Sequence, residues 1–183
     1  MAIGIFAIVL MGVGWSWDYV IDKTQEDSET KSMEILAKNS ITILLETSGA
    51  PSDWYLKDEE WFNDDEGDED DDDDEDEGNG LNIPDNLESI GLSVSYPSVL
   101  HKDKVVKLDE LSDTHYVMLR NVLGLRKYQF HIGFYIYDGN TYPNTPNYQA
   151  GNSSVGLAER VVVVTRYTTI NSNWTRVNYK VWK

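Results

Sequence analysis

The feature that most constrains this chain is an N-terminal run without charged residues, which passes directly into a charged, amphipathic segment. Residues Ala2 to Trp17 contain no Asp, Glu, Lys or Arg, whereas charged side chains recur from Asp18 to Glu46. No proline precedes Pro51, so nothing in the sequence interrupts a helix over this range. Apolar residues of the charged part recur at three- and four-residue steps, as one face of a helix does. We therefore predict one long helix that ends before Gly49 and Pro51.

This helix divides the molecule into a stalk and a head. At a rise of ~1.5 Å per residue, a helix that reaches Glu46 would be ~70 Å long. We assign residues 1–48 to the stalk and residues 49–183 to a globular head that carries an acidic loop at 58–80. The apolar content of 40% is sufficient for a packed core, and the absence of cysteine excludes disulfides and thiolate metal sites.

The apolar run has to be buried somewhere, because a helix that is apolar on every side is unstable in water. A secretory signal peptide is disfavoured, since no Lys or Arg precedes the run and no cleavage region follows it. A transmembrane helix needs ~20 apolar residues, a length reached only if Trp15, Trp17 and Tyr19 lie in the membrane interface. The remaining environments are the core of the head and a bundle of identical helices from other copies.

We favour burial among copies of the same helix, because the run lies at a terminus and has no polar face. Burial of each large apolar side chain contributes roughly 1.5–3 kcal/mol. Gly4, Gly12 and Gly14 permit close approach of helices, although each glycine costs ~1 kcal/mol of helix propensity relative to alanine. The side chains expected to form the core of such a filament are Ile3, Ile5, Phe6, Ile8, Val9, Leu10 and Val13.

One tract accounts for the acidity of the chain. Between Asp58 and Glu77 lie 16 acidic residues and no basic one, so the other 16 acids and 15 bases nearly cancel and the tract supplies most of the net charge of −17. Such a block is typical of a solvated loop, and it disfavours nucleic-acid binding. Clustered carboxylates also suit Ca²⁺, although the spacing of an EF-hand is absent. The candidate ligands are Asp70, Asp72 and Asp74, and the only cofactors expected are loosely bound divalent cations, which could also bridge subunits.

The head has the pattern of an α+β fold, with a small antiparallel sheet and one packed helix. Strands are predicted within Leu87–Tyr96, Gln129–Tyr137, Glu159–Thr169 and Thr175–Trp182. The last two should form an antiparallel hairpin. Ser112 to Thr114 is predicted to cap a helix that ends at Gly124, and Tyr142–Ser154 is predicted to be a polar loop.

No catalytic constellation is apparent, and we do not expect an enzyme. The three histidines, His101, His115 and His131, fall in different elements without metal-ligand spacing, and the alternation of its strand predicts that His131 is a surface residue. Asp109 and Glu110 are best explained as helix-capping carboxylates. No cofactor-binding motif occurs in the sequence.

Two N-glycosylation sequons occur in the head. They are Asn152-Ser153-Ser154 and Asn173-Trp174-Thr175, and both fall in predicted loops or turns. If the head is extracellular, Asn152 and Asn173 are candidate glycosylation sites.

Several segments occur in an order that resembles a known family. They are Leu44 to Trp54 with its Gly49-x-Pro51-x-x-Trp54 ending, Ile90-Gly91-Leu92-Ser93, Val122-Leu123-Gly124-Leu125 before Tyr128-Gln129-Phe130, and Arg176 to Trp182. This order resembles archaeal type IV pilins, the group of archaellar and adhesive pilins, over nearly the whole chain apart from the acidic tract. Many bacterial pilins carry an acidic residue near the start where this chain has Ile5.

The resemblance implies a precursor that is inserted in the membrane and cut by a prepilin peptidase, with the mature start at or near Met1. It also implies an extracellular filament with helices in its centre and heads outside, and it implies glycosylated heads. We therefore expect a structural subunit of an adhesive cell-surface filament whose partners are copies of itself. The alternatives are a surface binding protein anchored by a single membrane helix, and a minor pilin or pseudopilin.

Overall fold

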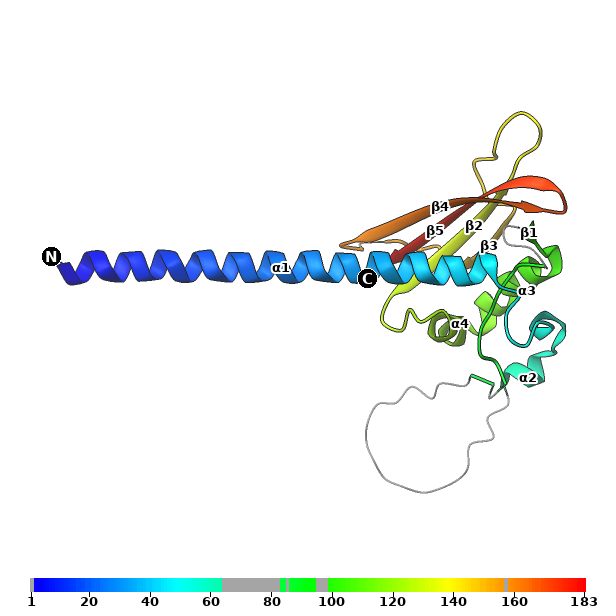
Figure 1. Cartoon of the computed structure of the whole chain (residues 1–183), viewed down its shortest axis with the longest axis horizontal. Coiled ribbons are helices and arrows are strands. Elements are labelled where there is room, and N and C mark those ends of the chain that lie inside the picture. Colours follow the sequence, from blue (N-terminus) through cyan, green and yellow to red (C-terminus); the bar gives the residue numbers. More distant parts are fainter. Residues whose placement is uncertain (1, 64–82, 85, 95–98, 157) are drawn as a thin grey trace, which may run out of the picture.

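The computed structural model describes residues 2–63, 83–84, 86–94, 99–156 and 158–183, with the backbone alone at 2–20, 22, 60 and 63. Helix α1 (Ala2–Glu46) is continuous over 45 residues, which corresponds to ~68 Å. Its second half lies against the head and its first half extends beyond the head (Figure 1). The chain then turns at Gly49, whose φ of +80° favours glycine. The predicted long helix and its end are thereby confirmed.

Five strands form one curled, mixed sheet in the order β1-β4-β5-β2-β3. The strands are β1 (Val99–Leu100), β2 (Gln129–Ile136), β3 (Tyr148–Gly151), β4 (Val161–Ile170) and β5 (Asn173–Trp182). All neighbours are antiparallel except β1, which pairs in parallel with the last two residues of β4. The α+β class is confirmed, with a parallel pair that the sequence did not indicate.

The hairpin of β4 and β5 follows the sequence prediction closely. Its turn consists of Asn171 and Ser172, which both have positive φ (48° and 66°), the conformation of a tight turn that matches the twist of the flanking strands. The edge strand β3 corrects the prediction of a loop over Tyr142–Ser154. Four of those residues pair with β2, although their polar, glycine-containing sequence gives no strand pattern.

Two other local predictions were wrong. Ser112 to Thr114 cap no helix, because they form the last turn of α3 (Lys102–Thr114), a helix that also contains Asp109 and Glu110. The next helix, α4 (Tyr116–Val122), starts after His115, and Gly124, with a φ of +71°, follows its end as predicted. The described part of Leu87–Tyr96 makes only isolated bridges, between Ser89 and Ala50 and between Ser93 and Leu100. The short helices η1 (Trp54–Leu56) and α2 (Glu59–Asn63) lie between α1 and this segment in the chain.

The core lies between the second half of α1 and one face of the sheet. Alternate residues of the central strands point toward the helix and are fully buried, which removes their apolar surface from water. These residues are Phe130, Ile132, Phe134, Val177, Tyr179 and Val181. From α1 they meet Met33, Ala37, Ser40, Ile41, Leu44 and Leu45. The hydroxyl oxygens of Ser40 and Tyr179 lie 3.0 Å apart, so the polar end of the buried tyrosine is satisfied, and burial raises the pKa of Tyr179.

Candidate functional site: the projecting helix and its attachment to the head

The head covers α1 only from Met33 onward. Met33 is 2% exposed, whereas Ile21 is 48% exposed, and the described side chains between these two residues are exposed apart from Glu29, which is half-buried. The backbone of α1 continues for a further nineteen residues toward the N-terminus, from Ala2 to Val20, away from the head (Figure 1). The part of α1 that leaves the head is therefore the candidate functional element.

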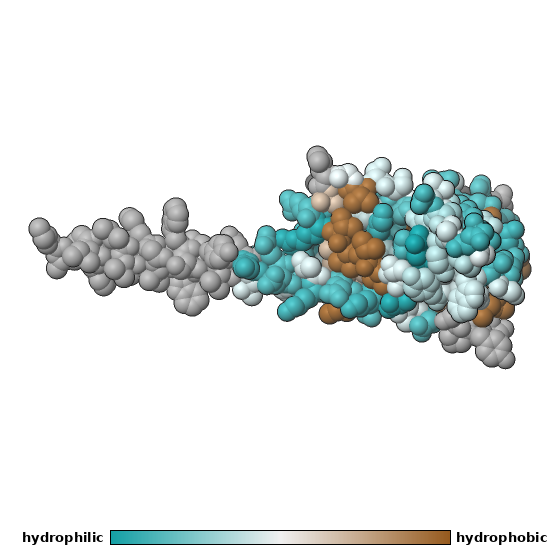
Figure 2. Space-filling model, turned by 90° about the horizontal axis from the view of Figure 1, so that it is seen from above, coloured by the Kyte–Doolittle hydropathy of each residue, from teal (hydrophilic) through white to brown (hydrophobic). Residues whose placement is uncertain are grey.

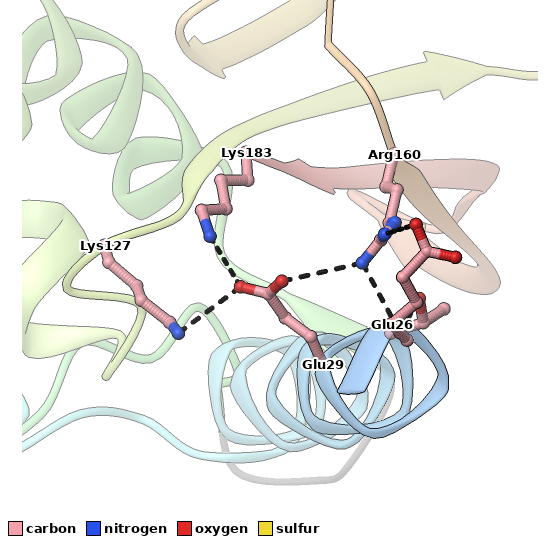
Figure 3. A network of polar contacts seen from close by, with 6 residues as sticks. Glu26, Glu29, Lys127, Arg160 and Lys183 are labelled. Atoms are coloured by element: carbon pink, nitrogen blue, oxygen red, sulfur yellow. Dashed lines mark hydrogen bonds and ion pairs between the residues drawn. The ribbon is translucent and has the colours of Figure 1, made fainter. Parts of the chain in front are cut away.

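A cluster of ion pairs ties α1 to the head where the helix emerges (Figure 3). The carboxylate of Glu29 accepts a hydrogen bond from Lys183 Nζ at 2.6 Å. It also lies 3.6 Å from Lys127 Nζ and 3.5 Å from a terminal nitrogen of Arg160. The other terminal nitrogen of Arg160 lies 3.0 Å from the Glu26 carboxylate. One acidic residue of the helix thus collects cations from three separate segments of the head.

The charges around Glu29 shift its titration. The hydrogen bond from Lys183 is the largest cause that lowers the pKa of Glu29, and the charges of Lys183 and Lys127 act in the same direction. The same pair raises the pKa of Lys183. These groups face solvent, so each pair contributes little by itself. Together they place Glu29 of α1 beside three cations of the head.

The other end of α1 is held by a buried lysine. Lys104 of α3 is 4% exposed, and its Nζ donates hydrogen bonds to the backbone oxygens of Ser48 at 2.7 Å and Ser93 at 3.4 Å. It also lies 5.4 Å from the centre of the Tyr55 ring. Burial lowers the pKa of Lys104. A cation beside the carbonyls that follow a helix is favourable, so Lys104 joins α1, α3 and the segment before β1.

Segments that carry the family resemblance meet at this same end. The indole nitrogen of Trp54 donates to the Gly91 oxygen at 3.1 Å, and the Leu92 nitrogen donates to the Leu44 oxygen at 2.7 Å. A Cβ atom on Gly91 would collide with the backbone oxygen of Thr47. Only glycine permits this approach of the Ile90–Ser93 segment to the end of α1.

The predicted site residues are only partly described. Ile3, Ile5, Phe6, Ile8, Val9, Leu10 and Val13 all lie in α1, but their side chains are outside the described part. Asp70, Asp72 and Asp74 also lie outside the described residues. Within the described ranges, no group of three His, Asp or Glu residues is placed to hold a metal ion. The same ranges contain no helix that is long and apolar enough to cross a membrane.

The histidines lie in separate elements, in accordance with the sequence prediction. His101 precedes α3 and His115 lies between α3 and α4. The prediction that His131 is a surface residue was wrong, because this side chain is 8% exposed and lies 3.4 Å from the Gln149 side-chain oxygen. Burial lowers the pKa of His131.

A pocket beside Glu29 is lined also by Met33, Tyr128 and Glu159, and no histidine lines it.

The two sequon asparagines are both exposed. The side-chain oxygen of Asn152 accepts a hydrogen bond from the Ser154 backbone nitrogen at 2.9 Å. Asn173 begins β5 at the tip of the hairpin, and Thr175 of the same sequon is fully buried.

Sequence reasoning missed Glu29 and Lys104, the residues that hold α1 at the two ends of its packed half. The signal for Lys104 was its position one residue before Val105 and four before Leu108, on the buried side of α3. No local signal marks Glu29, whose partner Lys183 is 154 residues away.

Comparison of the chain with protein-family models, with curated proteins and with solved structures finds no match.

Proposed function

We propose that this chain is the structural subunit of an extracellular, type IV pilus-like filament that serves surface adhesion. The N-terminal halves of α1 from many copies pack together in the filament centre, and the heads lie outside. Before assembly, the same segment resides in the membrane. The resemblance of the sequence to archaeal type IV pilins supports this function.

The observation that carries the proposal is the division of α1 into a covered and a projecting half. The head buries one side of α1 between Met33 and Leu45, and the helix continues beyond the head through a stretch whose sequence has no charge between Ala2 and Trp17. A helix that is apolar on every side requires burial. Copies of the same helix supply that burial and leave the folded heads unchanged.

Negative-stain electron microscopy of the purified chain, after removal of detergent, tests the proposal. We expect long fibres of uniform width. Ile8→Asp should abolish them, because a carboxylate in the apolar centre would be buried without a partner. Circular dichroism should show a folded head in this variant, because Ile8 is distant from the packed half of α1.

The matched control is Leu56→Asp, which places the same charge on a head residue that is 70% exposed. Fibres should persist in this variant. Fibres that form normally with Ile8→Asp would refute the assembly through α1. Intact protein that remains a detergent-bound monomer would favour a surface protein anchored by a single helix, and incorporation only into fibres of another subunit would indicate a minor pilin.

A further inference from the structure

The face of the sheet that points away from α1 differs between its two ends (Figure 2). Near the projecting helix it exposes the aliphatic side chains Val161 and Val163, which are 40% and 55% exposed. Toward the β4–β5 turn it exposes aromatic rings instead, because Tyr167 and Trp174 are 61% and 62% exposed. Aromatic side chains are enriched at interaction surfaces, so this end of the face is a candidate binding surface.

The strand register places Tyr167 in one cross-strand row and Trp174 in the next. Tyr135 of β2, Arg176 of β5 and Tyr167 of β4 are direct cross-strand neighbours. Trp174 is paired with Thr169, and it therefore lies diagonally beside Tyr167 on the same face. We call Tyr135, Tyr142, Tyr167, Trp174 and Arg176 the aromatic platform.

The loop between β2 and β3 completes the platform from above the sheet. The ring of Tyr142 lies 6.2 Å from that of Tyr167 and 5.3 Å from that of Tyr137. The guanidinium of Arg176 lies 4.7 Å from the Tyr135 ring and 5.1 Å from the Tyr142 ring. These cation–π contacts explain how the loop is held against the sheet. They leave the exposure of Tyr167 and Trp174 without a structural reason.

Two neutral polar side chains, Asn178 and Thr165, adjoin the platform. The next cross-strand row toward the stalk consists of Gly133, Asn178 and Thr165. The Thr165 hydroxyl donates to the Asn178 side-chain oxygen at 3.1 Å, which leaves the amide hydrogens of Asn178 available as donors. The outward positions of β2, β4 and β5 contain no carboxylate, and their cations are Arg176, which the two tyrosines sandwich, and Lys180.

We propose that the aromatic platform binds neutral carbohydrate polymers built from hexoses. The C–H face of a pyranose ring stacks on the flat rings of Tyr167 and Trp174, while its hydroxyl groups bond to the amide and hydroxyl groups of the adjacent row. A partner with an aliphatic surface would instead be expected to bind over Val161 and Val163. Carbohydrate binding would name the class of ligand to which the proposed adhesive filament attaches. It rests on the proposed function in one respect only, which is that this face of the sheet points outward from the filament.

Affinity electrophoresis tests binding with the full chain dispersed in non-ionic detergent, so that fibre formation is not required. Native gels contain dextran, laminarin or galactomannan, which are neutral polymers of glucose, mannose or galactose. We expect at least one of them to retard the wild-type protein. Tyr167→Ala and Trp174→Ala should each weaken this retardation about tenfold, because each removes a stacking surface.

The matched control is Val163→Ala, a truncation on the same face at a similarly exposed position, which should leave the retardation unchanged. All three substitutions are at exposed positions, so circular dichroism should show an intact head.

No retardation by any of the three polymers overturns the proposal. It is also overturned if the Tyr167 and Trp174 variants retain full retardation, and a loss of fibres in those variants would then assign the platform to contacts between copies. Fibre formation by the wild-type chain without retardation refutes carbohydrate binding alone, whereas retardation without fibres refutes the filament alone.

Discussion

The two halves of α1 are one continuous helix, yet they differ in their apolar pattern and in their position relative to the head. From Met33 to Leu45 the helix is amphipathic, and the sheet buries its apolar side. Between Ala2 and Trp17 the sequence is apolar without a polar side, and the helix there extends beyond the head. Among the described side chains, those that α1 contributes to the core of the head come from the second half. This is why we propose contacts with other copies as the role of the first half.

The largest effect on the head is expected from the packed half of α1. Ile41 is fully buried, so Ile41→Ala removes apolar contacts and leaves a cavity, which should lower the free energy of unfolding by about 2–5 kcal/mol. Chemical denaturation followed by tryptophan fluorescence measures this change. Ile43→Ala, two residues away and 46% exposed, is the control and should cost far less. If both variants have equal stability, the packed half of α1 does not belong to the core.

An intermediate effect is expected where the two halves meet, at Glu29. Its pKa is lowered from 4.5 in the folded protein, so its pairs contribute stability above that pH, and this contribution is lost as the pH falls further below 4.5. A nitroxide at Ser32→Cys is a unique label, because the chain contains no cysteine. Its spectrum should become more mobile below this pH in the wild type, and in Glu29→Gln it should be mobile at every pH.

Glu34→Gln provides the matched control for Glu29. Its hydrogen bond to Lys38 also lowers the pKa of Glu34, but this pair lies within α1 and does not reach the head. We expect the label at residue 32 to keep its pH-dependent mobility in this variant. A constant spectrum in the wild type down to pH 3 would show that the cluster around Glu29 does not hold the helix.

The smallest effect is expected from removal of residues 64–77, because a block of like charges is typical of a solvated loop. This deletion eliminates 13 acidic residues, and fibres should still form with or without Ca²⁺ in electron micrographs. Loss of fibres on deletion, together with dissolution of wild-type fibres by a chelator, would instead indicate that cations bridge the acidic tracts of neighbouring subunits.

Local patterns in the sequence were sufficient for α1, for the β4–β5 hairpin and for the α+β class. The helix has no proline before Pro51 and a glycine after its last turn, and the hairpin combines a run of valines, a short turn and the alternating segment Thr175–Trp182. Helix α3 was missed because its buried side consists of a few apolar residues and Lys104 among many charged ones. A charged residue on the buried side conceals the helical period.

Features that depend on distant partners could not be predicted from local patterns. Strand β1 has two residues and exists only because it meets the end of β4. His131 follows the alternation of its strand, but Gln149 of β3 packs beside it. The platform around Arg176 requires the register of three strands and the position of a loop. Such contacts arise from tertiary structure, which overrides local propensity.

The tight turn at Asn171 and Ser172 lies at the end of the head that is farthest from the tip of α1 (Figure 1). If the heads lie outside the fibre as we propose, a fluorophore or a short epitope introduced there would be separated from the projecting half of α1 by the head. The same attachment point adjoins Trp174, so the emission of such a dye would also respond to molecules that settle on the neighbouring rings. The hairpin tip is thus a natural position for engineering tagged or sensing fibres.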